Sequence, residues 1–131
     1  MKPALLDVNV LMALAWPSHI HHEAAHEWFG EEQKYGWATC PITQTALVRL
    51  SSNPKILADA VSPKQGIALL EQMTALEFHQ FWADDVSLTE APIFNEDYIV
   101  GHRQITDAYL LALAMQHNGR LVSFDRAIGT Y

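Results

Sequence analysis

The chain is poor in cysteine and in basic residues. Cys40 is the only cysteine among 131 residues, so no disulfide can form within the chain, and this is typical of a protein of the reducing cytosol. Lysine and arginine together number 8 against 15 aspartates and glutamates, which gives a formal net charge of −7. This charge argues against binding nucleic acid through a broad basic face and would suit a basic protein partner.

The chain also lacks long hydrophobic runs. No uninterrupted apolar stretch is long enough to span a bilayer. Asp7 and Asn9 interrupt the apolar N-terminal segment that ends at Trp16, and no small-residue cleavage site closes it, so we expect no signal peptide. Half of the residues are nevertheless hydrophobic, which is enough to bury one core. We therefore expect a single cytoplasmic domain over residues 1–131, without a membrane partner.

Apolar strand patterns alternate with helical patterns along the chain. Strands are expected over 2–6, 36–40, 77–82 and 121–124. Helices are expected over 8–15, 19–33, 42–52, 63–76 and 104–117, with Ser18 and Ser62 as N-caps and a further short helix after Pro92. This order predicts an α/β sandwich around a mainly parallel sheet.

Three aspartates lie at positions that a parallel sheet would bring close together. Asp7 follows the first strand and Asp125 the last, and parallel sheets bind ligands beyond the carboxyl ends of their strands. Asp107 lies in the first turn of a helix, where the helix dipole favours a carboxylate. Grouped carboxylates repel one another unless a hard cation such as Mg²⁺ neutralises them. The alternative is that two of them are ordinary helix caps and the third is a turn residue.

Three segments, in order and spread over the whole chain, resemble the PIN-domain ribonucleases and, more narrowly, the VapC-type toxins of bacterial type II toxin–antitoxin pairs. The segments are Leu5–Leu11, Ile105–Ala114 and Gly119–Arg126. The resemblance implies a PIN-like three-layer α/β sandwich. It also implies an Mg²⁺- or Mn²⁺-dependent endoribonuclease, in which metal-activated water hydrolyses RNA phosphodiester bonds.

The resemblance also implies roles for single residues. Asp7 and Asp107 would be the main metal ligands, and Asp125 would complete the catalytic cage. Ser123 would hydrogen-bond a ligand carboxylate or water, and Asn9 would orient Asp7.

The resemblance further implies partners. These are a structured RNA substrate such as transfer RNA or ribosomal RNA, a VapB-like antitoxin and a second copy of the chain in a homodimer. Arg103 and Arg126 flank the acidic motifs and are candidates for contacts with RNA phosphate.

The sequence departs from the family's pattern at one acid. The family usually carries a further acid, often glutamate, on the helix after the second strand, but Thr43–Leu50 holds none and Gln44 takes the position. An amide can accept a hydrogen bond from bound water but brings no negative charge. A second interpretation therefore stays open, a catalytically weak PIN-like module that only binds RNA or protein.

A third interpretation comes from His22–His26, which reads H-E-A-A-H and matches the HExxH pattern of zinc peptidases. No glutamate or histidine lies between Glu32 and Glu71 to act as a nearby third ligand. We therefore interpret this segment as a partly exposed, histidine-rich helix.

We expect Gln44→Glu to tighten the binding of Mn²⁺, because the substitution returns a negative charge to the position where the family has one. Isothermal titration calorimetry of the two proteins measures the change. An unchanged or weaker affinity would contradict the assignment of Gln44.

Overall fold

The computed structural model describes residues 1–90, 101–124 and 129–130, and of Arg103, Gly129 and Thr130 it describes only the backbone. Its elements in chain order are β1 (Ala4–Leu6), α1 (Val8–Ala15), α2 (His22–Glu32), η1 (Gln33–Tyr35), β2 (Trp37–Thr39), α3 (Pro41–Ser51), α4 (Pro63–Thr74), β3 (His79–Phe81), η3 (His102–Gln104), α5 (Ile105–Gln116), β4 (Arg120–Ser123) and β5 (Gly129–Thr130). Among the described helices, none has the length and apolar character needed to cross a membrane.

The strands form one sheet in the order β3-β2-β1-β4-β5, with β1 at its centre. The first four strands of this order run parallel, and β5 pairs antiparallel with β4. Leu5 of β1 lies opposite Ala38 of β2 on one side and Leu121 of β4 on the other. This sheet confirms the predicted α/β class with a mainly parallel sheet.

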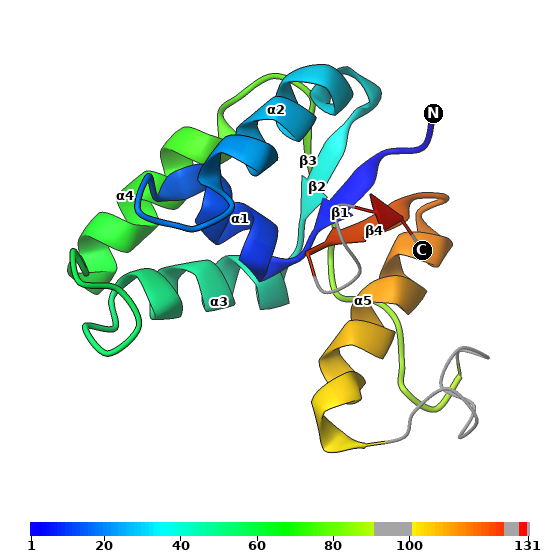
Figure 1. Cartoon of the computed structure of the whole chain (residues 1–131). Helices are drawn as coiled ribbons and strands as arrows, with labels where there is room; N and C mark the ends of the chain where they lie inside the picture. Colours follow the sequence, from blue (N-terminus) through cyan, green and yellow to red (C-terminus); the bar gives the residue numbers. More distant parts are fainter. Residues whose placement is uncertain (91–100, 125–128, 131) are drawn as a thin grey trace.

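Alternate side chains of the strands enter two separate cores, one on each face of the sheet. Leu5 is fully buried and packs among residues of α5. Its neighbours Ala4 and Leu6 pack instead with residues of α1 and α2. Successive side chains of a strand point to opposite faces, so a strand buried on both faces is mostly apolar, as β1 is. Figure 1 shows the resulting layers, with α1 to α4 on one side of the sheet and α5 on the other.

Local signals predicted several boundaries correctly. Residues 8–15 are helical as expected. Ser62 caps α4: its Oγ accepts from Gln65 N at 3.1 Å, while Gln65 Oε1 accepts from Ser62 N at 2.9 Å. The short helix expected after Pro92 falls within residues 91–100, outside the described part of the chain.

The prediction that Ser18 caps the second helix was wrong. That helix begins at His22, and its N-cap, His21, makes no side-chain capping bond. The residues before it form turns of their own, because His19 N donates to Trp16 O and His22 N donates to His19 O, both at 3.0 Å. These backbone bonds hold the segment outside helical geometry, and serine alone does not override them.

Two glycines offer a matched test of how tightly the sheet and α5 pack. A Cβ at Gly119 would lie 2.6 Å from Trp82 Cη2 and 2.8 Å from Pro3 O. We expect Gly119→Ala to destabilise the fold by about 1–3 kcal/mol, as overpacking does. Gly30 lies within α2 with nothing within 4 Å of an added Cβ. We expect Gly30→Ala to stabilise by about 0.5–1 kcal/mol, because alanine loses less backbone entropy in a helix. Urea denaturation measures both, and a Gly119→Ala protein as stable as the parent would contradict the packing described here.

Candidate active site

Asp7 is a nearly buried carboxylate at the carboxyl end of the central strand. It follows β1 directly, caps the N-terminus of α1 and is 7% exposed. Its Oδ1 accepts from the backbone N–H of Val8 at 2.8 Å, and its Oδ2 accepts from Ser123 Oγ at 3.0 Å. Its own N–H donates to Val122 O at 3.0 Å. Donors from α1 and β4 therefore fix the orientation of this carboxylate.

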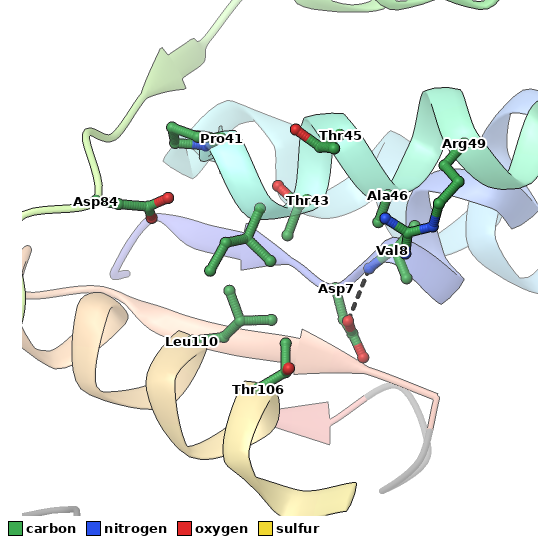
Figure 2. Close-up of a pocket in the computed structure, with 11 residues that line it drawn as sticks. Asp7, Val8, Pro41, Thr43, Thr45, Ala46, Arg49, Asp84, Thr106 and Leu110 are labelled. Carbon is green, nitrogen blue, oxygen red and sulfur yellow. Dashed lines mark hydrogen bonds between the residues drawn. The ribbon is translucent and has the colours of Figure 1, made fainter. Parts of the chain in front are cut away.

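Asp7 opens onto a cavity of about 560 Å³. The cavity lies between the starts of α1 and α5, helix α3 and the segment after β3. Its polar lining consists of two carboxylates, one guanidinium and three hydroxyls, from Asp7, Asp84, Arg49, Thr43, Thr45 and Thr106. Figure 2 shows Asp7 and Thr106 close together near the middle of this lining and Asp84 at the end away from Asp7. Among the residues that the structure describes, the lining of this cavity is thus acidic and includes one cation, Arg49.

The first turn of α5 borders this cavity, but Asp107 itself is not among its lining residues. Thr106 and Leu110 of α5 line the cavity, and Asp107 is the exposed residue that follows Thr106. Asp125 lies outside the described residues, as does Arg126, and only the backbone of Arg103 is described. Across the described ranges, no three histidine, cysteine, aspartate or glutamate side chains gather as a metal-binding group.

Gln44 does not line the Asp7 cavity, although Thr43 and Thr45 on either side of it do. Its Nε2 donates to Thr39 Oγ1 at 2.9 Å, and that hydroxyl also shares a hydrogen bond of 2.8 Å with His79 Nε2. Its side chain borders a separate groove between α3 and α4. A glutamate at this position would have to leave Thr39 to reach the cavity.

Asn9, like Gln44, does not line the Asp7 cavity. Together with Trp16 and His19 it lines a second cavity of about 360 Å³ on the other side of the first turn of α1. The structure therefore brings Asp7, Ser123 and the start of α5 together, and it places Asn9 and Gln44 at neighbouring pockets.

Two charged residues that line the cavity, Asp84 and Arg49, were not predicted from the sequence as site residues. Asp84 Oδ1 accepts from the hydroxyl of Tyr109 at 3.0 Å. Burial, together with this bond to Asp84, raises the pKa of Tyr109 to about 12. The sequence did contain a pattern that could have indicated Asp84, because this acid lies shortly after the third strand, as Asp7 lies after the first. Arg49 is the one basic residue of α3, and within the part of the chain that is described it forms no ion pair.

The two histidines of the HExxH segment stabilise the fold. His22 Nδ1 lies 2.7 Å from Ala13 O, and His26 Nε2 lies 2.8 Å from Leu14 O. These carbonyls belong to the last turn of α1, where backbone acceptors lack helical partners. Each imidazole therefore caps α1 and ties it to α2, which agrees with the structural interpretation of this segment.

Comparison with known proteins places the chain in a family. The model of the PIN domain matches residues 4–130, so the chain belongs to the PIN-domain family. It is 49% identical over 125 residues to ribonuclease VapC39 of Mycobacterium tuberculosis, covering 95% of this chain and 90% of that protein. It is also 49% identical over 127 residues to ribonuclease VapC38 of the same organism, covering 97% and 88%. Within the PIN domains, the chain is a member of the VapC ribonuclease group.

A solved structure shares the fold. The crystal structure of VapBC2 from Rickettsia felis bound to a DNA fragment from their promoter matches with a TM-score of 0.62 and 17% identity, over 95% of this chain and 92% of that chain. The expected PIN-like architecture is thereby confirmed.

Proposed function

We propose that this chain is a divalent-metal-dependent endoribonuclease that acts as the toxin of a toxin–antitoxin pair. The observation that carries the proposal is the buried, doubly hydrogen-bonded carboxylate of Asp7 at an open acidic cavity. Such a carboxylate costs folding free energy, and its position at the carboxyl ends of parallel strands is where ligands bind. The similarity to proteins named as VapC ribonucleases supports the same activity.

The donors at the site fit Mg²⁺ or Mn²⁺. The cavity offers carboxylate and hydroxyl oxygens, and neither a thiolate nor an imidazole is among the lining residues in the described part of the chain. Hard cations prefer such oxygens. Asp7 and Asp107 would hold the ion, and Asp125 would complete the set. When bound, the ion would activate water and neutralise charge on the scissile phosphate.

Other side chains of the protein would orient the metal ligands and bind the RNA backbone. Ser123 acts as a positioning residue, because its hydroxyl holds the Asp7 carboxylate in one orientation. Arg49 would contact the phosphate backbone, since a guanidinium forms paired hydrogen bonds with phosphate oxygens. Arg103 and Arg126 remain candidates for further phosphate contacts.

We also propose a VapB-like antitoxin and a homodimer. The crystal structure with a similar fold described above is of VapBC2 from Rickettsia felis bound to promoter DNA, which supports an antitoxin partner. The carboxylates of Asp7 and Asp84 at the cavity suit a basic side chain of that partner. A structured RNA, such as transfer RNA or ribosomal RNA, is the proposed substrate.

One observation favours a second function, a PIN-like module that binds RNA or protein with weak catalysis. Gln44 adds no carboxylate to the cavity and is engaged with Thr39. Fewer carboxylates would weaken the binding of a divalent cation, so direct measurement of cleavage separates the two functions.

We expect Asp7→Asn and Asp107→Asn each to lower metal-dependent RNA cleavage by more than about a hundredfold, because each removes a negative ligand. Asparagine keeps the shape of the side chain, so circular dichroism should show an intact fold. The control is Asp59→Asn, an exposed aspartate away from the cavity. Equal background cleavage by the parent and both variants would refute the enzymatic function and favour the binding module.

We expect Arg49→Met to lower kcat/KM by about tenfold or more, because a hydrogen bond to a charged group contributes roughly 1.5–3 kcal/mol. Arg49→Lys should recover part of the loss, since it restores the charge without the paired donors. Lys55→Met is the matched control, because Lys55 is exposed in a turn after α3 and does not line the cavity. A loss of equal size in both methionine variants would argue for a general charge effect.

A further inference from the structure

Three aromatic rings gather just past the end of β4 and have no place in the proposed chemistry. The rings of His21 and Phe124 are 4.5 Å apart between centroids and 27° from parallel, and those of His19 and Phe124 are 6.2 Å apart and 26° from parallel. Phe124 directly follows Ser123, whose hydroxyl orients Asp7. We call His19, His21 and Phe124 the ring cluster.

The ring cluster is accessible and held in place. His21 is exposed, while His19 and Phe124 are half-buried. The backbone N–H of His21 donates to His19 Nδ1 at 3.0 Å, and the turn around them has its own backbone bonds. Ile20, between the two histidines, is 88% exposed, so this turn is not covered by the core. The outer face of His21 is therefore open to a ligand.

The ring of His19 suits stacking better than ionic contacts. Because His19 Nδ1 accepts a hydrogen bond, it carries no proton in this geometry. Burial, followed by the nearby charges of His21 and His22, lowers the pKa of His19 below its ordinary value. At neutral pH this ring is accordingly uncharged, so it offers a π-face rather than a cation.

A cavity adjoins the ring cluster and shares His19 with it. This is the cavity of about 360 Å³ that Asn9 and Ser18 line with polar groups, and Met12, Trp16 and Leu57 supply apolar walls. Asn9 lies two residues after Asp7 in the first turn of α1. An apolar pocket with a few polar groups and an aromatic entrance is the usual form of a site for a flat ligand.

We propose that the ring cluster and this cavity form a subsite for an unpaired RNA base that flanks the scissile phosphate. The inference rests on the endoribonuclease function proposed above. A chain with net charge −7 offers little electrostatic attraction to RNA, whereas stacking on aromatic rings needs no positive charge and tolerates any base. The Asn9 amide, which can donate and accept, would contact the edge of the stacked base.

Binding of a labelled, random-sequence single-stranded RNA 12-mer, measured by fluorescence anisotropy in the Asp7→Asn background, tests the subsite without cleavage. We expect His21→Ala to weaken binding about tenfold, which corresponds to ~1.4 kcal/mol, and His21→Phe to keep the parent's affinity. Tyr35→Ala is the control, because that exposed aromatic side chain lies in η1, outside the ring cluster. Equal affinities of the parent and His21→Ala, or a loss shared by Tyr35→Ala, would overturn the proposal.

A second measurement uses an oligonucleotide whose cleavage site has been mapped with the parent enzyme. One abasic nucleotide next to that site should raise KM about tenfold in the parent and leave KM unchanged in His21→Ala, because the stacking partner is already absent. An equal rise in both proteins would overturn the subsite while leaving the nuclease intact. If the parent does not cleave RNA, the proposed function fails, and the anisotropy result still decides whether the ring cluster binds RNA.

Discussion

The burial of one carboxylate at the end of the central strand is the constraint on which the rest of the site depends. An ionised side chain taken out of water must receive hydrogen bonds from the protein. Asp7 receives them from the first N–H of α1 and from Ser123 of β4. Parallel pairing that places Leu6 opposite Val122 brings Ser123 beside Asp7. The geometry of the carboxylate is therefore a consequence of strand register.

The scarcity of positive charge shapes how this acidic chain could engage RNA. Arg120 is already committed to the fold, because it is 8% exposed and pairs with Glu32 at 2.9 Å. Arg49 is the cation that faces the Asp7 cavity. A cavity with so little positive charge can receive either a cation or a basic side chain of a partner. RNA affinity would then come from bound metal, from Arg49 with the candidates Arg103 and Arg126, and from stacking at the ring cluster.

The helices and strands predicted from the sequence agree best with the structure where the prediction depends on residues close together in the chain. The capping box at Ser62 and the helix over residues 8–15 depend on neighbours in the sequence. The start of α2 was misplaced because turn hydrogen bonds around His19 compete with helix formation. The antiparallel β5 was not expected, since two residues carry too little pattern to signal a strand.

Apolar patterns and spacing in the sequence predicted the order of strands and helices and placed Asp7 directly after the first strand. The PIN-type architecture was predicted from the resemblance of three segments to the PIN-domain ribonucleases. Long-range packing settled which side chains share a cavity. Thr43 and Thr45 line the cavity that Asp7 also lines, whereas the side chain of Gln44 between them donates to Thr39. The packing of α3 against its neighbours sets which of its side chains reach each cavity. That packing is a long-range property that local patterns do not contain.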